Sequence, residues 1–425
     1  MTRFSLLNGL FVVCISVLGA GCGARTGLPA PDLGPDAGMD SGMDMGVDAE
    51  IPCLEIPFDG GIVEVELETE ARVGRADVVF LIDRTLSMSA EINRIRDRLR
   101  DRIAPAIRSA IPDSQVAVAS FADFPVADYG TAEDNDTPFT LHSSSSAAIE
   151  SAQGAVDSIR LSNGLDRRES QVEALYQVAT GAGIGDFVQP SVGCPSGGIG
   201  YACIRTDALP VIMLFTDAQF HQDPFESGSN YIGISPSPHT WDEAVGALDA
   251  INARVLGFDS GGGAPAPPLR RLATMTGAVD DRGQPLVFDI GESGERLSTG
   301  VVDAIRTFAS TVIQDISVVA QDPDRNDGVD VLQFIDGIIP ARAIPADGVS
   351  GIDVPGQAFL GVRAGTLLVY RVALRNGVVA PGVGPQRFRL ELLFRGDGST
   401  FIDRQIVEIV IPGADGSGCD DLLEL

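Results

Sequence analysis

The fold is decided by the stretch Asp77-Val78-Val79-Phe80-Leu81-Ile82-Asp83-Arg84-Thr85-Leu86-Ser87-Met88. Its apolar first half is typical of a buried parallel strand, and its polar second half of the loop at the C-terminal end of that strand. Isoleucines and a leucine then recur at three- and four-residue spacing as far as Ile107, which predicts a helix. Strand, polar loop and helix form a βα unit, and ligands of open α/β sheets bind at such strand ends.

Three oxygen-bearing side chains occupy alternate positions on this loop, namely those of Asp83, Thr85 and Ser87. On a turning loop their oxygens can converge on one point, which suits a hard divalent cation. The pattern Asp-x-Thr-x-Ser resembles the metal-ion-dependent adhesion site of von Willebrand factor A domains, whose usual form is Asp-x-Ser-x-Ser. For these five residues taken alone, a capped helix start is the alternative interpretation.

Three later segments extend the resemblance to the I-like domain of integrin β-subunits. Residues 211–218 form a second apolar run that ends in an aspartate, and with residues 219–221 they resemble the Thr-Asp-Ala-x-x-His segment of those domains. Asp166 and Glu169 match their Asp-x-x-Glu, and residues 121–126 match a segment that supplies a further carboxylate. All four segments occur in the order found in the family.

The resemblance implies a central Mg²⁺ ion. The hydroxyls of Thr85 and Ser87 and the carboxylate of Glu169 would bind it directly, and Asp83 and Asp217 would hold its water ligands. Magnesium takes six oxygens and keeps waters readily, so one position stays open. In the family that position takes an Asp or Glu carboxylate of a protein ligand.

A neighbouring Ca²⁺ ion is also implied, shared by Asp123, Asp166 and Glu169. Gly164 departs from the family pattern, which commonly has an asparagine ligand there. His221 is expected to be a hydrogen-bonding residue at a strand end and not a ligand. Since the chain has only three histidines, a multi-histidine catalytic metal centre is not expected.

Composition limits the class of protein. A chain of 425 residues with 44% hydrophobic content can hold two or three domains with real cores. Its 59 acidic against 30 basic residues give a net charge of −29, which argues against nucleic acid and anionic membrane surfaces as partners. The chain contains no lysine, which excludes Schiff-base catalysis and the phosphate-binding loop with its lysine.

Alternating strand and helix patterns follow the motif and predict a doubly wound, mostly parallel α/β sheet with helices on both faces. The expected strands are 77–82, 115–121, 139–141, 210–215, 254–258 and 285–290. The expected helices, besides the one that follows the motif, are 169–180, 241–253, 268–276 and 295–314.

Past residue 314 the apolar period becomes two, and turn signals separate the runs, which predicts a small β-sandwich. One alternating strand, Val63 to Glu68, precedes the α/β region. We therefore expect the α/β domain to be inserted in the sandwich, as in the hybrid domain of integrin β-subunits, or else simply followed by it. The expected segments are 52–73 (first strand of the sandwich), 74–315 (von Willebrand factor A-like), 316–413 (sandwich) and 414–425 (acidic tail).

The N-terminus predicts a lipid anchor. Residues 1–21 have the charge and apolar length of a signal peptide, and Leu18-Gly19-Ala20-Gly21-Cys22 resembles the lipobox of bacterial lipoproteins. Cys22 would carry the lipid; ordinary signal cleavage is the alternative. Residues 22–51 repeat aspartate every four positions from Asp32 to Asp48, which indicates a solvated tether. We expect an envelope protein of the outer membrane or cell surface, bound to the membrane only by its lipid.

Four cysteines remain in the expected folded part, an even number that suits disulfides in an oxidising compartment. Cys194 and Cys203 bracket a glycine-rich loop that a disulfide would hold together. Cys53 and Cys419 flank the whole folded region, and a bridge between them is the simplest pairing, although the other connectivities stay open.

The sequence favours a non-enzymatic, envelope-anchored adhesion or ligand-binding protein that captures an acidic group through its metal. One alternative is a scaffold or assembly protein whose metals only stabilise loops. The other is a metal-dependent hydrolase, but no nucleophile elbow or separate carboxylate pair is present. Arg395-Gly396-Asp397 spells the tripeptide that integrins recognise, yet Asp397-Gly398 is explained by a hairpin turn.

Overall fold

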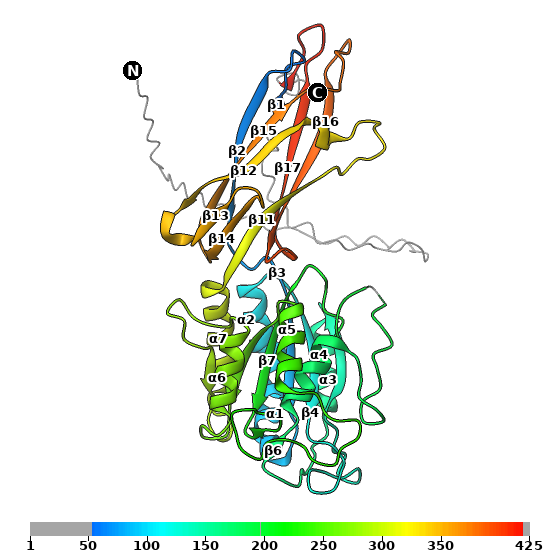
Figure 1. The fold of residues 1–425 in the computed structure, drawn as a ribbon, viewed down its shortest axis with the longest axis vertical. Coiled ribbons are helices and arrows are strands. Elements are labelled where there is room, and N and C mark those ends of the chain that lie inside the picture. Colours follow the sequence, from blue (N-terminus) through cyan, green and yellow to red (C-terminus); the bar gives the residue numbers. More distant parts are fainter. Residues whose placement is uncertain (1–52, 196, 420–425) are drawn as a thin grey trace, which may run out of the picture. The chain divides into compact units, whose positions relative to one another are not determined.

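The computed structural model describes residues 53–195 and 197–419 (Figure 1). The predicted signal peptide, the predicted lipidation site Cys22 and the predicted tether lie outside the described residues, and so do residues 420–425 of the predicted C-terminal tail. Among the helices of the described residues, none is both long and apolar enough to cross a membrane.

A six-stranded sheet forms the centre of the α/β domain, a name used here for residues 75–311. Its strand order is β10-β9-β7-β3-β4-β5, and every neighbouring pair is parallel except β4 with β5. The mixed α/β class with a mostly parallel sheet is thus confirmed. The strands are β3 (Arg75–Asp83), β4 (Asp113–Phe121), β5 (Thr140–Ser146), β7 (Leu209–Thr216), β9 (Arg254–Asp259) and β10 (Val287–Asp289).

Helices cover both faces of this sheet. Along β3 the side chains alternate, so Phe80 packs in one hydrophobic cluster and Leu81 in the other. Residues of α1, α2, α3 and α7 belong to the first cluster, those of α4 and α5 to the second, and α6 contributes to both. The helices are α1 (Ser89–Arg98), α2 (Ala104–Ala110), α3 (Ile149–Ser158), α4 (Gln171–Thr180), α5 (Trp241–Ala250), α6 (Ala266–Met275) and α7 (Leu297–Thr311).

The helix predicted after the motif is interrupted by a π-helical turn, Leu99–Ile103, between α1 and α2. Repeated four-residue steps drift by about 40° each around an α-helix with 3.6 residues per turn. A wider turn offsets this drift. As a result Leu99, Ile103 and Ile107 all stay fully buried against the sheet.

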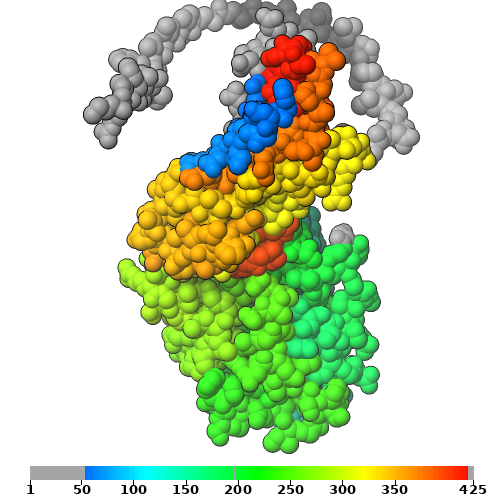
Figure 2. Space-filling view, turned by 45° about the horizontal axis from the view of Figure 1, so that its top comes forward, coloured from blue at the N-terminus to red at the C-terminus, as the bar shows by residue number. Residues whose placement is uncertain are grey.

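Two further sheets form the β domain, a name used here for residues 53–70 and 313–411. Their strand orders are β1-β17-β16-β11-β14-β13 and β12-β15-β2, and side chains of both sheets share one hydrophobic cluster. The blue N-terminal strands lie against orange and red C-terminal strands, since β1 pairs with β17 and β2 with β15 (Figure 2). The strands are β1 (Cys53–Glu55), β2 (Ile62–Glu70), β11 (Ile313–Gln321), β12 (Ile335–Ile344), β13 (Gly351–Asp353), β14 (Ala358–Arg363), β15 (Leu367–Arg375), β16 (Gln386–Gly396) and β17 (Thr400–Ile411).

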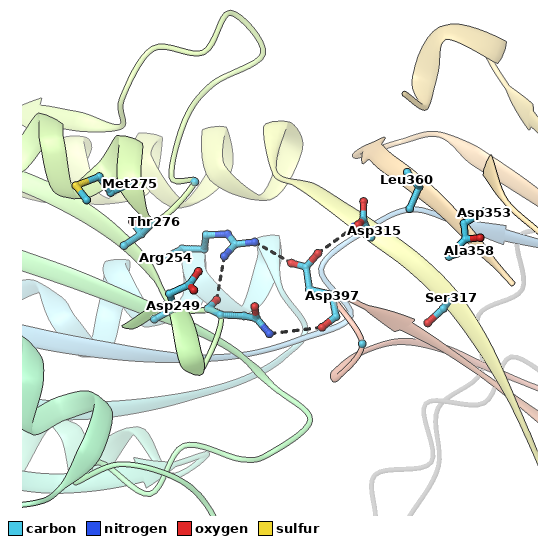
Figure 3. A pocket seen from close by; sticks show the side chains of 14 residues that line it. Asp249, Arg254, Met275, Thr276, Asp315, Ser317, Asp353, Ala358, Leu360 and Asp397 are labelled. Atoms are coloured by element: carbon cyan, nitrogen blue, oxygen red, sulfur yellow. Dashed lines mark hydrogen bonds and ion pairs between the residues drawn. The ribbon is translucent and has the colours of Figure 1, made fainter. Parts of the chain in front are cut away.

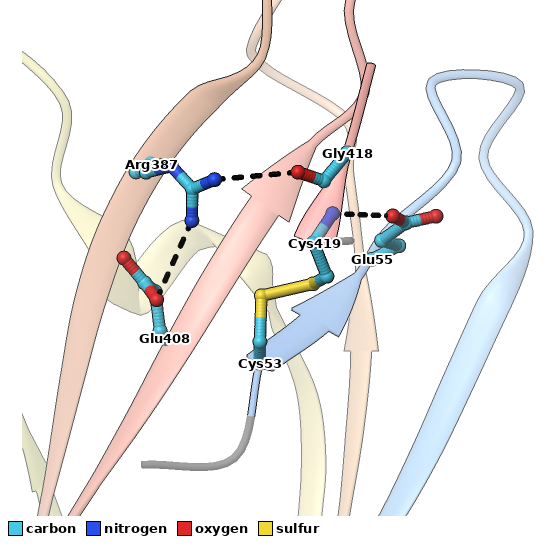
Figure 4. Close-up of a disulfide and its surroundings, with 6 residues drawn as sticks. All are labelled: Cys53, Glu55, Arg387, Glu408, Gly418 and Cys419. Atoms are coloured by element: carbon cyan, nitrogen blue, oxygen red, sulfur yellow. Dashed lines mark hydrogen bonds and ion pairs between the residues drawn. A yellow bond between two sulfur atoms is a disulfide. The ribbon is translucent and has the colours of Figure 1, made fainter. Parts of the chain in front are cut away.

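Both expected disulfides are present. Cys194 and Cys203 are bonded across their short loop, and Cys53 is bonded to Cys419 across a sequence separation of 366 residues. The second bridge is supported by a hydrogen bond of 2.6 Å from the backbone N–H of Cys419 to Glu55 Oε1 (Figure 4). It joins the first strand of the β domain to the segment that follows β17.

In the Arg395-Gly396-Asp397 tripeptide, the aspartate is bonded to other residues of the same chain. Asp397 lies at the turn between β16 and β17 with a positive φ of 47°. Its carboxylate pairs with Arg254 at 2.8 Å and accepts a hydrogen bond of 2.9 Å from the backbone N–H of Asp315, at the border of a cavity of about 630 Å³ (Figure 3). The turn interpretation of this tripeptide is therefore confirmed.

Candidate metal centre

The carboxyl ends of neighbouring strands bring the predicted site residues together. Asp83 is the last residue of β3, Asp217 follows β7 directly, and these two strands are parallel neighbours. Glu169 ends the short strand β6 (Arg168–Glu169), which pairs with β8 (Gln219–Phe220) just beyond Asp217. Segments distant in the sequence thus meet at one edge of the sheet, where ligands of open α/β folds bind.

Hydrogen bonds orient the hydroxyl groups of the motif. Thr85 Oγ1 donates to Asp83 Oδ1 at 2.7 Å, and Thr85 Oγ1 and Ser87 Oγ are 3.2 Å apart. Asp83 Oδ2 accepts a hydrogen bond of 2.7 Å from Thr216 Oγ1. Asp83 therefore positions the neighbouring hydroxyls while remaining fully buried itself.

A cleft of about 360 Å³ lies at the hydroxyl groups of the motif. Thr85, Ser87, Glu169 and Asp217 line it, which are four of the five residues predicted for the central ion; Asp83 is not among the lining residues. The cleft is also lined by Asn163, Asp166, Arg167, Ala218, Gln219 and Ala264.

Ionisation of the carboxylates at the cleft is unfavourable in the metal-free protein. Glu169 is 4% exposed, and its Oε2 atom has no hydrogen-bond partner. Burial, followed by repulsion from Asp83, raises the pKa of Glu169 well above its usual range. Burial and the charge of Asp217 raise the pKa of Asp83 to about 7, and burial also raises the pKa of Asp217.

A divalent cation fits this set of side chains. It would give the orphaned oxygen of Glu169 a partner and would offset the repulsion among the buried carboxylates. The available donors are hydroxyl and carboxylate oxygens, the ligands that magnesium prefers.

A second cluster lies beside this cleft. Asp123 follows β4, His221 follows β8, and each of Asp123, Asp166 and His221 offers a ligand atom within 4.8 Å of the other two. His221 Nε2 is 3.0 Å from Asp166 Oδ2 and 3.3 Å from Asp123 Oδ2. In residues 53–195 and 197–419 this is the only such group of three, and it could hold a metal ion. Glu169 is outside the group, so its sharing between two ions stays a prediction.

His221 follows β8 directly and forms hydrogen bonds, as predicted for a residue at a strand end, but its position between Asp123 and Asp166 was not predicted. The signal was present, since the Thr-Asp-Ala-x-x-His segment ends on it. Its Nδ1 atom is 2.8 Å from the carbonyl oxygen of Ser229, and the ring is 2% exposed. Burial alone would lower the pKa of His221, but its contacts with Asp123 and Asp166 raise it to about 9.

Gly164 has a steric reason for departing from the family pattern. Its φ is +65°, and a Cβ atom there would lie 3.0 Å from Glu169 Oε1. Glycine gives the carboxylate room and adopts this backbone conformation without strain. The adjacent Asn163 lines the cleft instead.

Comparison with protein-family models finds no match, and comparison with curated protein sequences finds none either. Similar solved structures include a von Willebrand factor type A protein from Catenulispora acidiphila, with 13% identity and a TM-score of 0.34 over 86% of this chain and 73% of that one. Another is proximal thread matrix protein 1 from the mussel byssus, with 16% identity and a TM-score of 0.35 over 59% of this chain. A third is the pilus adhesin SpaC from Lactobacillus rhamnosus GG in an open conformation, with 13% identity and a TM-score of 0.30 over 83% of this chain. The last two matches span 51% and 46% of the proteins concerned.

Proposed function

We propose that this protein captures an acidic group of a protein partner through a divalent cation at the carboxyl ends of β3 and β7. The observation that carries the proposal is the buried Oε2 atom of Glu169, which has no partner and belongs to a residue lining an open cleft. In this proposal Thr85, Ser87 and Glu169 bind a Mg²⁺ ion directly, and Asp83 and Asp217 hold its waters. The ion supplies one coordination position for an oxygen from outside the protein.

The rim of the cleft suits an acidic side chain with apolar neighbours. Arg167 lines the cleft and adds a positive charge. Two leucines that are each 51% exposed, Leu86 and Leu165, are sequence neighbours of residues that line the cleft. Because the whole chain carries a net charge of −29, a bound cation is needed to attract an acidic partner.

We propose a binding function and not an enzymatic one. The pair Ser120–His142 has a hydrogen bond of 2.7 Å like that of a nucleophile and its base. Ser120 is fully buried, however, so no substrate could reach it. Burial also lowers the pKa of His142 to about 4, which makes it a weak base at neutral pH.

We place this function at the bacterial cell envelope, through a lipid on Cys22. The two disulfides support an oxidising compartment. We also propose that the α/β domain is inserted in the β domain and that the two are coupled. The coupling is supported by their short connection, since α7 ends at Thr311 and β11 begins at Ile313. A shift of α7 on ligand binding would then move one domain on the other. Unchanged small-angle scattering after a ligand is bound would contradict this coupling.

A peptide array tests the proposed capture. Peptides that contain Asp or Glu are printed beside their Asn or Gln counterparts and probed with the protein in Mg²⁺ or in EDTA. We expect Mg²⁺-dependent binding to acidic peptides only, lost in Ser87→Ala and kept in Ser89→Ala, the next serine along the chain. Stabilisation by Mg²⁺ without any capture of acidic peptides would contradict the proposal and favour the scaffold alternative.

A further inference from the structure

Asp123, Asp166 and His221 differ chemically from the central cleft because one of the three ligand atoms is nitrogen. His221 Nε2 lies 3.0 and 3.3 Å from one oxygen of Asp166 and one of Asp123. A tetrahedral site with bonds of about 2.0–2.1 Å has ligand atoms about 3.3 Å apart. The two distances, which in the metal-free protein are a hydrogen bond and an ion pair, are compatible with two edges of such a tetrahedron.

Neighbouring groups hold His221 and Asp123 in place. The carbonyl of Ser229 can only accept, so the Nδ1 atom of His221 donates to it and Nε2 is the nitrogen that faces the carboxylates. Metal-binding histidines nearly always have such a partner on their other ring nitrogen. Asp123 Oδ1 accepts hydrogen bonds from the hydroxyl of Tyr231 at 2.5 Å and from the backbone N–H of Phe124 at 2.6 Å.

The second oxygen of Asp123 points to a missing ligand. Asp123 is fully buried, and its Oδ2 atom accepts no hydrogen bond, although His221 Nε2 lies 3.3 Å from it. A buried carboxylate oxygen that accepts no hydrogen bond is costly, and a bound cation would coordinate it. This is a second observation, independent of the grouping of acidic residues.

An ion could enter this cluster from the cleft. Asp166 lines the cleft, and its side chain is 30% exposed. The other side is closed by aromatic rings, since Tyr129 packs edge-on against His221 at 5.2 Å and Tyr231 stacks on it at 4.0 Å. Three protein ligands with one open side are typical of a zinc site that keeps its fourth position for another ligand.

We propose that Asp123, Asp166 and His221 bind a divalent transition-metal ion of the zinc class, in place of the calcium predicted for this position. Calcium takes six to eight oxygen ligands, whereas imidazole nitrogen suits zinc and its neighbours. The proposal does not depend on the central magnesium ion, because none of its three ligands belongs to the set Asp83, Thr85, Ser87, Glu169 and Asp217.

Calorimetric titration of Zn²⁺ into the metal-free protein tests this, with excess Mg²⁺ present so that the central site is occupied. Co²⁺ serves as a second probe, because its visible spectrum reports tetrahedral coordination and a nitrogen ligand. We expect one Zn²⁺ per chain, and binding about 100-fold weaker in His221→Gln. Tyr231→Phe removes only the hydrogen bond to Asp123 and should weaken binding about tenfold.

Two controls keep the outcomes distinct. His239→Gln changes a histidine paired with Glu173 outside the cluster and should bind Zn²⁺ normally. Ser87→Ala should lose magnesium binding but keep the zinc site, so the two proposals can fail separately. Folded wild-type protein that binds no Zn²⁺, or equal binding by His221→Gln and by the second variant Asp166→Asn, would overturn the proposal and leave His221 as an ion-pair partner of the two aspartates.

Discussion

The two ends of strand β3 each carry a buried aspartate, and the protein pairs only one of them with a cation. At the N-terminal end, Asp77 Oδ1 accepts hydrogen bonds from Nε and Nη2 of Arg205 at 2.9 and 2.7 Å. Asp77 Oδ2 accepts a hydrogen bond of 2.7 Å from the backbone N–H of Arg205. At the C-terminal end, Asp83 has only hydroxyl and amide donors. Glu169 and Asp217 add further carboxyl groups there, and burial raises the pKa of both.

This difference indicates that Asp77 has a structural role and that Asp83 has a functional one. Burying a charge is costly unless an opposite charge accompanies it, and at Asp77 the chain supplies that partner. Beside it, burial would raise the pKa of Asp113, but hydrogen bonds from Arg205 and Arg75 lower it. At the Asp83 end, Arg84 is near enough to interact electrostatically with Asp83 and Glu169. Its guanidinium, however, donates its hydrogen bonds to the carbonyl oxygens of Arg160 and Asn135 and to the hydroxyl of Thr137. Because no side-chain cation of the described residues is bonded to Asp83, we infer that its partner is a cation taken from solution.

The largest effect is expected at the paired end. Arg205→Gln leaves Asp77 buried without its cation and should lower the free energy of unfolding by about 3–5 kcal/mol, as measured by urea denaturation. Arg282→Gln, at an exposed position, is the control and should change little. Magnesium binding by the folded fraction should stay unchanged, because the two ends are separate. A loss below about 1 kcal/mol would show that Asp77 does not depend on Arg205.

The unpaired end should make the metal-free protein sensitive to pH. Asp83 has a pKa of about 7 in the fold against its usual value of 3.8, so the folded state binds more protons than the unfolded state between these two pH values. In EDTA, stability should therefore fall as pH rises from about 4 to 7, by up to about 1.4 kcal/mol per pH unit. Thermal unfolding at several pH values measures this. Excess Mg²⁺ should flatten the trend, and an equal slope with and without Mg²⁺ would contradict the assignment.

The smallest expected change in the free energy of unfolding is an increase, whereas Arg205→Gln at the paired end should cause a decrease. Glu169→Gln keeps the shape of the side chain but removes a repelled charge, so it should stabilise the metal-free protein by about 1 kcal/mol at pH 8. It should also abolish the stabilisation by Mg²⁺, which is about 2.7 kcal/mol at 100 times the dissociation constant. Glu150→Gln, at an exposed position of α3, is the control. Destabilisation of the metal-free Glu169→Gln protein would remove the contrast between the two ends.

Much of this arrangement could be predicted from the sequence. The apolar runs before Asp83 and Asp217 predict parallel strands, and parallel neighbours bring their carboxyl ends to one edge of the sheet. Helix α3 escaped prediction because much of its buried face is alanine, as at Ala152 and Ala155, which gives a weak periodic signal. The orientation of the His221 ring could not be predicted, because it depends on contacts with Ser229 and Asp123 that form only in the folded protein.

The most direct test of the central claim is calorimetric titration of Mg²⁺ into the protein and into an Asp83→Ala, Ser87→Ala double variant. An Asp281→Ala, Ser293→Ala variant, changed at exposed positions, is the matched control. We predict saturable binding by the wild type and the control, and none by the Asp83, Ser87 variant. Absence of Mg²⁺ binding by the folded wild type, or equal binding by all three proteins, would contradict the claim that the unpaired end of β3 is a cation site.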